Sequence, residues 1–296
     1  MSRARFRLQQ PPIGFLVRSR LELLAPVRWF RRWSRPRQAD VFLLSFPKAG
    51  RTWLRVMLAK LLAEQFDLRG LESERFDGRT VLPGGVPRIL AKHDGSPQKK
   101  TAGEIGADRR EFAGCRVILL VRDPRDMAVS NYFQVTRREG SYQGDLSSYL
   151  REPRGSVDSM IRYYNVWARD RELPRDFMLL RYEDIHADPA RELRRIASFI
   201  GLQQFGDDAI GRAVEHASFA AMKAREARRD ADGSPLAAGR SGDLESFKTR
   251  RGKVGGYRDY LSDDDIAWLD RRIDRELDPF YGYRGGPASP TGGASN

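Results

Sequence analysis

The sequence of 296 residues contains one cysteine, Cys115, and three histidines. A single cysteine excludes a disulfide within the chain and argues against a cysteine-ligated metal site. No apolar run approaches the roughly 18 residues of a membrane span, and no clean apolar stretch precedes a small-residue cleavage site, as a secretory signal would require. These absences favour a cytoplasmic protein in a reducing compartment.

Acidic residues are almost absent from residues 1–39, which hold ten arginines and only one glutamate, Glu22. The segment supplies +9 of the formal net charge of +13, so the rest of the chain is only mildly basic. Tryptophans and aliphatic residues lie among the arginines. The segment could therefore contact an anionic membrane surface peripherally, or it could form a helix packed on the domain. No recognised nucleic-acid motif accompanies it, and we expect no specific nucleic-acid partner.

Short apolar runs alternate with helical patterns along the chain. We expect strands at 41–45, 88–92, 117–121 and 177–181, and helices at 52–66, 125–136, 156–171 and 189–201. This alternation predicts an α/β fold with a central, mainly parallel sheet. We expect a basic extension (1–39), one domain (40–283) and a disordered tail (284–296), with mobile loops at 138–156 and 230–243.

The stretch "SFPKAGRTW" (45–53) joins the first strand to the first helix through a turn that contains Lys48 and Gly50. The free amides at a helix N-terminus and the positive end of its dipole favour an anion there. In a Walker A loop the lysine follows the second glycine and precedes a magnesium-binding hydroxyl, whereas Lys48 precedes the glycine. The loop therefore indicates a terminal phosphate-like group bound without that metal arrangement; alternatively, Lys48 is a surface residue of an ordinary turn.

The stretch "VRDPRDMAVSNYF" (121–133) places Arg122 at the carboxyl end of the third strand and Ser130 on the helix that follows. Ligands of open α/β sheets bind outside the carboxyl ends of the strands, so Arg122 is expected near an anion together with Lys48. The alternative is a structural ion pair between Arg122 and Asp126.

Together these two motifs resemble the nucleotide-binding motifs of the sulfotransferases that use 3′-phosphoadenosine 5′-phosphosulfate (PAPS). Three later segments are similar to that family in the same order: "LLRYEDIHADPARELRRIASFIGL" (179–202), "HASFAAMK" (216–223) and "RRGKVGGYRDYLS" (250–262). The resemblance implies a parallel sheet with helices on both faces, PAPS as cosubstrate without a metal, and release of adenosine 3′,5′-bisphosphate (PAP).

The resemblance also implies roles for individual residues. Lys48, with Ala49, Gly50, Arg51 and Thr52, would hold the 5′-phosphosulfate, and Trp53 would stack on adenine. Arg122 and Ser130 would bind the 3′-phosphate, Tyr182 and Phe219 would line the adenine pocket, and Arg250, Arg251 and Gly252 would close over the 3′-phosphate.

His93 in "RILAKHDGSP" (88–97) is the expected general base, because an imidazole can accept a proton at neutral pH. The motif resembles the family's Lys-x-His sequence, although a structural histidine at a strand end is the alternative. The family's lysine is replaced by Ala91 here. Lys92 should point to the opposite face of the strand, so it is not expected to substitute unless the strand has already ended there. The first loop also departs from the family, with Ala49 and Arg51 at serine and threonine positions.

The expected reaction is attack by a hydroxyl or amine acceptor on the sulfuryl group, with His93 taking the proton and Lys48 neutralising the leaving phosphate. The other readings are a P-loop kinase using ATP and a non-catalytic protein that binds through its basic tail. The acceptor, whether a small molecule, a lipid or a glycan, is left open, since loops 68–87, 138–156 and 230–246 would shape its pocket. Aromatic residues that could line this pocket are Tyr132, Phe133, Tyr142 and Tyr149.

Overall fold

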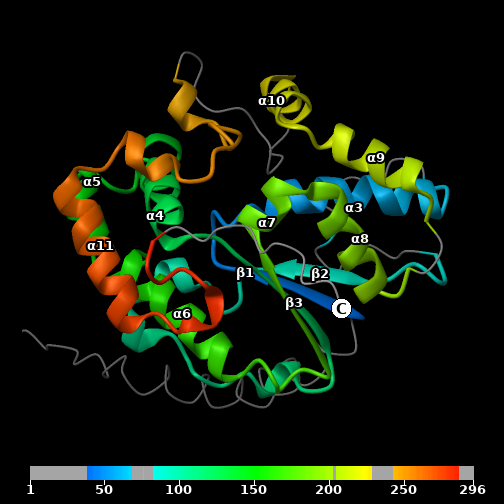
Figure 1. The fold of residues 1–296 in the computed structure, drawn as a ribbon, viewed down its shortest axis with the longest axis horizontal. Coiled ribbons are helices and arrows are strands. Elements are labelled where there is room, and N and C mark those ends of the chain that lie inside the picture. The colour runs from blue at the N-terminus through cyan, green and yellow to red at the C-terminus, as the bar shows by residue number, and fades with distance from the viewer. Residues whose placement is uncertain (1–38, 69–75, 77–82, 203–204, 229–242, 287–296) are drawn as a thin grey trace, which may run out of the picture.

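The computed structural model describes residues 39–68, 76, 83–202, 205–228 and 243–286 (Figure 1). The basic extension apart from Ala39, most of loops 68–87 and 230–246, and residues 287–296 of the expected tail lie outside the described residues.

The strands are β1 (Val41–Ser45), β2 (Ile89–Lys92), β3 (Arg116–Val121) and β4 (Asp176–Arg181). The helices are α3 (Arg51–Gln65), α4 (Pro124–Phe133), α5 (Leu146–Leu150), α6 (Val157–Arg169), α7 (Tyr182–Ala187), α8 (Pro189–Phe199), α9 (Asp207–His216), α10 (Phe219–Arg228) and α11 (Asp263–Glu276). A π-helical turn (Gln134–Arg138) extends α4. Short 3₁₀ turns cover Pro97–Lys99, Ala102–Glu104, Arg110–Phe112, Leu244–Ser246, Gly256–Asp259 and Pro279–Tyr281.

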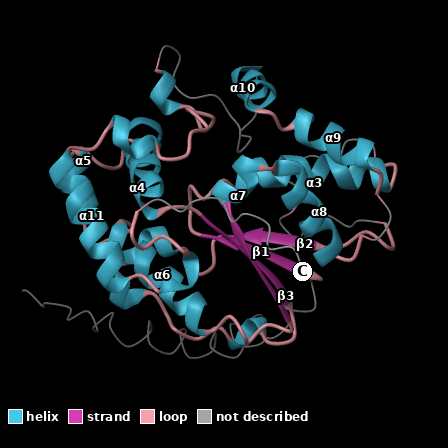
Figure 2. Cartoon of the chain, in the orientation of Figure 1, coloured by secondary structure: helices cyan, strands magenta, loops and turns pink. Residues whose placement is uncertain are grey.

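The four strands form one parallel sheet in the order β2-β1-β3-β4. In Figure 2 the sheet lies between two groups of helices, with α4, α5, α6 and α11 on one side and α3, α7, α8, α9 and α10 on the other. The predicted α/β class and the parallel sheet are therefore confirmed.

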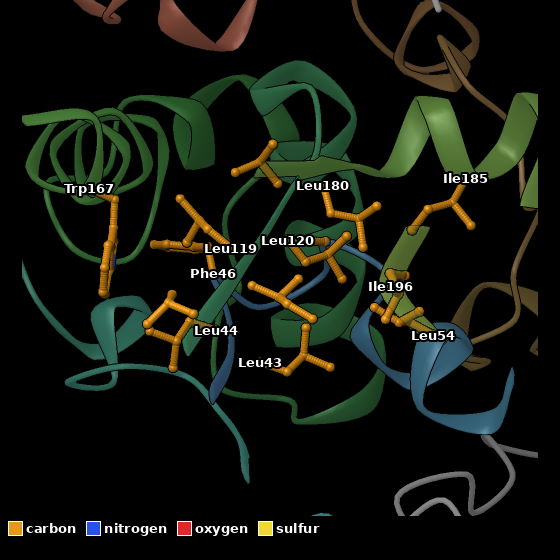
Figure 3. Close-up of a cluster of buried hydrophobic side chains, with 14 of the residues drawn as sticks. Leu43, Leu44, Phe46, Leu54, Leu119, Leu120, Trp167, Leu180, Ile185 and Ile196 are labelled. Atoms are coloured by element: carbon orange, nitrogen blue, oxygen red, sulfur yellow. The ribbon is translucent and has the colours of Figure 1, made fainter. Parts of the chain in front are cut away.

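The central strands β1 and β3 are largely apolar because both of their faces are covered. All five residues of β1 are buried. Leu44 points toward Trp167 of α6, whereas Leu43 points toward the opposite helix layer, where Leu54 of α3 lies (Figure 3). A strand buried on both sides needs a continuous apolar run rather than alternation, which is the pattern these strands show.

The chain leaves β1 and β3 in opposite directions across the sheet. β1 connects through α3 to β2 on one side, and β3 connects through α4 and α6 to β4 on the other. Such a switch point leaves a crevice at the carboxyl ends of the two strands, where open α/β sheets bind ligands. The fold therefore directs the segments that follow β1 and β3 into one crevice.

Part of the predicted loop 138–156 is ordered helix instead. Helix α5 lies within it, with Asp145 accepting a hydrogen bond from the Ser148 amide at its N-terminus. Tyr149 and Leu150 are buried. The loop interpretation was wrong for this part because the glycines flank a short apolar turn that packs against α4.

Candidate active site

The loop after β1 turns sharply to deliver an uncapped helix. Lys48 and Gly50 both have positive φ, 74° and 94°. No side chain caps the first turn of α3, and its first backbone bond runs from the Leu54 amide to the Gly50 carbonyl. The amides of residues 50–53 therefore remain available to an anion, supported by the helix dipole.

Gly50 is required by its surroundings as well as by its dihedral angle. A Cβ atom at this position would lie 2.6 Å from Cδ2 of Tyr182. The Tyr182 ring also meets the Trp53 ring edge-on, with centroids 5.7 Å apart. The Trp53 indole donates a hydrogen bond of 2.7 Å to the carbonyl of Ala217, between α9 and α10. An aromatic wall thus forms beside the loop.

Arg122 follows β3 and is held at several points. Its backbone amide donates to the Tyr164 hydroxyl (2.9 Å), and this hydroxyl donates to the Arg122 carbonyl (3.0 Å). The guanidinium lies 4.3 Å from the Tyr182 ring centre and contacts Asp126 at 3.3 Å. The ion pair considered from the sequence is thus present. Even so, the Nε of Arg122 is buried without a hydrogen-bond partner among the described residues, and the side chain lines the cavity.

The C-terminal loop closes over this region from the opposite side. Arg250 pairs with Glu245 at 2.8 Å and lies over the Phe133 ring, and Arg251 pairs with Asp259 at 3.1 Å. Gly252 has a φ of 59°, and a Cβ there would approach the exposed ring of Phe219 to 2.6 Å. The Arg122 guanidinium donates to the carbonyl of Lys253 at 3.1 Å, so the loop is joined directly to the residue after β3.

His93 lies directly after β2, and its hydrogen bond identifies its tautomer. Its Nδ1 is 2.9 Å from the carbonyl oxygen of Ser45, an atom that can only accept. Nδ1 therefore carries the proton, and Nε2 presents a lone pair. Burial, together with the nearby charges of Arg51, Lys248 and Lys48, lowers the pKa of His93 to about 3, although the hydrogen bond with Ser45 acts in the opposite direction. The imidazole is neutral at physiological pH, as a proton acceptor must be.

Lys92 does not contribute charge to this region. Its ammonium lies 4.6 Å from the Phe112 ring centre and 4.0 Å from the Glu111 carboxylate, on the side of the strand away from the cavity. Lys92 thus points away from the cavity, as the alternation along a strand predicts.

These segments line one cavity of about 1030 Å³. The predicted site residues that line it are Lys48, Gly50, Arg51, Thr52, Trp53, His93, Arg122, Ser130, Tyr182, Phe219, Arg250, Arg251 and Gly252. Ala49 does not, because its methyl group is fully buried in the core. Of the four aromatic residues suggested for an acceptor pocket, Tyr142 and Tyr149 line the cavity, whereas Tyr132 and Phe133 pack behind it.

The cavity is strongly cationic. Burial, together with repulsion by Lys248, Arg138, Arg250 and Arg122, lowers the pKa of Lys48 to about 7. The ammonium of Lys48 meets the neutral amide oxygen of Gln134 at 3.0 Å rather than a carboxylate. A desolvated cluster of like charges is costly on its own and is relieved by an anionic ligand.

Several lining residues were not predicted from the sequence, among them Lys248, Arg55, Gln134 and His186. Lys248 precedes the "RRG" stretch by two residues, and that proximity was the available signal. No motif in the sequence identifies His186 as a site residue, yet its Nε2 lies 2.8 Å from the carbonyl oxygen of Gly252.

Among the described residues, no helix combines the length and apolar composition needed to span a bilayer. The His, Cys, Asp and Glu side chains in the same part of the chain form no group of three or more that could hold a metal ion.

Comparison with known proteins gives consistent relatives. The family model described as "Sulfotransferase domain" matches residues 111–280. Flavonol 3-sulfotransferase of Flaveria bidentis is 22% identical over 265 residues, covering 80% of this chain and 81% of that protein. Cytosolic sulfotransferase 17 of Arabidopsis thaliana is 24% identical over 274 residues, covering 83% and 77%. The crystal structure of mouse sulfotransferase SULT7A1 complexed with PAP matches with a TM-score of 0.56 and 18% identity, covering 81% of this chain and 84% of that one.

Proposed function

The chain belongs to the sulfotransferase domain family, and we propose how the residues of its cavity carry out the reaction. The predicted class is confirmed: the protein is an enzyme that transfers the sulfuryl group of PAPS to an acceptor, rather than a P-loop kinase or a non-catalytic binding protein.

We place the nucleotide across the ends of β1 and β3. In this arrangement the amides of residues 50–53 and the Lys48 ammonium bind the 5′-phosphosulfate. Trp53, Tyr182 and Phe219 enclose the adenine. Arg122, Ser130 and the Arg250–Gly252 segment bind the 3′-phosphate, for which the unpartnered Nε of Arg122 provides a donor. Ala49 contributes through its backbone at most, since its side chain is in the core.

We assign the general base to Nε2 of His93. The acceptor oxygen attacks sulfur, the bond from sulfur to the bridging oxygen breaks, and its electron pair stays on the 5′-phosphate of PAP. The acceptor proton passes to Nε2, while Nδ1 stays bonded to Ser45. Lys48 stabilises the charge that grows on the leaving phosphate. The bound dianionic phosphosulfate raises the pKa of His93 from its low value in the empty cavity, which makes the imidazole a more effective base.

One observation supports this assignment most strongly: Lys48, His93 and Arg122, which follow three adjacent parallel strands, line the same cavity beside an uncapped helix. Isothermal titration calorimetry with PAP tests it. We expect tight binding by the wild type and strong weakening by Arg122→Met. Preference for ATP–magnesium over PAP would contradict the assignment.

For the acceptor, we propose a small molecule that presents a hydroxyl group beside His93. Support comes from the relative that acts on a flavonol and from Tyr142, Tyr149 and Tyr260, which line the cavity. Labelled PAPS incubated with hydroxylated aromatics, sterols, amines, glycans and lipids, followed by mass spectrometry, identifies it. Sulfation confined to glycans or lipids would overturn this proposal.

Three further assignments remain proposals. We propose domain limits of 40–283, supported by the full burial of Tyr283. A cytoplasmic location is supported by the relative named as cytosolic. Peripheral contact between residues 1–39 and anionic membranes is supported by their charge, and vesicle sedimentation with and without this segment tests it.

A further inference from the structure

Lys248 places a second ammonium group in the reaction region of the cavity. The residue lines the cavity, and among the described residues the carboxylate of Glu226 acts on its charge, raising its pKa against the larger lowering effect of burial. Its charge acts on both Lys48 and His93: repulsion from Lys248 contributes to the lowered pKa of each. All three side chains line the same cavity, so Lys248 shares it with the anion-binding lysine and the assigned base.

The neighbouring strand supplies no charge at this point. Ala91 has none, and Lys92 points toward Phe112 and Glu111 outside the cavity. During transfer the sulfuryl oxygens next to His93 carry negative charge in a region from which water is largely removed, so a fixed cation there is strongly stabilising. Lys248 reaches this region from the C-terminal loop instead of from the strand.

Glu226 of α10 holds Lys248 in place. Its carboxylate is fully buried and accepts hydrogen bonds from the backbone amides of Lys248 (2.5 Å) and Thr249 (2.7 Å). Arg138, at the end of the π-helical turn, contacts the same carboxylate at 3.4 Å. A buried carboxylate that binds two consecutive amides fixes the direction in which the first side chain leaves the backbone. The contact connects three segments that are far apart in the sequence.

We propose that Lys248 is a catalytic residue that donates a hydrogen bond to a non-bridging oxygen of the transferring sulfuryl group, and that Glu226 is the residue that positions it. The inference rests on the proposed function. Lys248 keeps its protons throughout: sulfur moves from the bridging oxygen of PAPS to the acceptor oxygen, and the acceptor proton goes to His93. Both residues lie outside the segments that resemble other sulfotransferases. Glu226 follows the segment 216–223, and Lys248 precedes the "RRG" stretch.

The test compares two ligands that differ only by the sulfuryl group. Calorimetry without acceptor measures the Kd of PAP and of PAPS for the wild type, Lys248→Met and Lys248→Arg. Loss of one charge-assisted hydrogen bond should raise the Kd of PAPS roughly 10- to 100-fold in Lys248→Met. The Kd of PAP should change far less, and Lys248→Arg should recover part of the difference. Lys60→Met, at a surface lysine paired with Glu64 on α3, is the matched control.

Glu226→Gln should lower the preference for PAPS over PAP in the same direction, whereas Glu215→Gln, on the exposed face of α9, should leave it unchanged. A general loss of stability would weaken the binding of PAP and PAPS equally and leave the ratio of their Kd values unchanged. Equal weakening of PAP and PAPS by Lys248→Met, or no weakening, would overturn the role of Lys248 alone. A wild type that binds neither ligand would remove the proposed function and this inference together.

Discussion

The Nδ1 atom of His93 lies 2.9 Å from the backbone carbonyl oxygen of Ser45, so β1 fixes the tautomer of a residue that follows β2. The adjacent strands thereby orient the imidazole with its basic nitrogen toward the cavity. This arrangement separates two duties of the ring, since one nitrogen anchors it and the other accepts a proton.

Substitution of His93 should distinguish these duties. In His93→Asn the amide nitrogen can still donate to Ser45, but no basic nitrogen remains. We expect kcat to fall by roughly 10²- to 10⁴-fold while the affinity for PAP is retained, as measured by steady-state kinetics and calorimetry. Retention of normal turnover would remove His93 from the mechanism.

The pH profiles of the wild type should differ between the two kinetic parameters. With a pKa of about 3 in the empty cavity, His93 stays deprotonated as the pH falls, so kcat/KM should show no acid limb from this residue down to about pH 5. The bound phosphosulfate raises the pKa of His93, so the acid limb of kcat should lie at higher pH than that of kcat/KM. Coincident acid limbs, absent in His93→Asn, would contradict the expected coupling.

Binding of PAP should take up protons through Lys48. The pKa of Lys48 is lowered to about 7 in the empty cavity, so above this pH the free amine is largely neutral. An anion favours the ammonium and raises this pKa, and the Kd should therefore increase with pH, by up to about tenfold per unit above pH 7. Calorimetry in buffers of different ionisation enthalpy measures the uptake.

Lys48→Met should weaken PAP binding by about 1.5–3 kcal/mol and remove most of that proton uptake. Unchanged uptake in this variant would assign the proton to another group, such as Lys248, whose pKa burial lowers to about 8.

Gly50→Ala should damage the loop, because the new Cβ would lie 2.6 Å from Tyr182 and the φ of 94° is unfavourable for alanine. We expect a loss of about 1–3 kcal/mol in the free energy of unfolding and weaker PAP binding. Gly211→Ala is the matched control, since this helical glycine of α9 has open space around it. There, the same change should stabilise by roughly 0.5–1 kcal/mol. Similar effects at both positions, in chemical denaturation, would contradict the steric argument.

Tyr164→Phe should make the backbone at Arg122 less rigidly held, while the contacts of the Arg122 side chain stay in place. The change removes both hydrogen bonds between the Tyr164 hydroxyl and the Arg122 backbone. We expect about 1–3 kcal/mol of destabilisation, together with a lower affinity for PAP. Tyr281→Phe also loses a buried hydrogen bond, from its hydroxyl to the Tyr164 carbonyl, and provides the comparison. If both variants bind PAP equally, Tyr164 acts on stability alone.

The sheet was predictable because each strand is a short apolar run with polar or charged residues beyond it. The observed strands begin and end within one residue of the predicted positions. The same rule located much of the site: Lys48, His93, Arg122 and Tyr182 follow β1, β2, β3 and β4, and the carboxyl ends of parallel strands meet at one edge.

The remaining elements have weaker local signals. Helix α7 begins directly after β4, so no turn residues mark its start. Helix α11 buries only Asp265, Leu269 and Ile273 within a charged sequence, so its apolar periodicity is weak. The only local signal for Lys248 is its proximity to the "RRG" stretch, and its placement depends on Glu226, which is distant in the sequence and also contacts Arg138. Local patterns specify strands and turns, but contacts between distant loops arise only from the assembled fold.

The buried end of the domain has a consequence for biosynthesis. The Tyr281 hydroxyl donates to the carbonyl of Tyr164, whose own hydroxyl holds Arg122, and the Tyr283 hydroxyl donates to Glu183 at 2.8 Å. Translation delivers these tyrosines long after the sheet-forming residues. A nascent chain can therefore assemble its strands on the ribosome, but it completes the support beneath Arg122 only when residues 281–283 emerge from the exit tunnel.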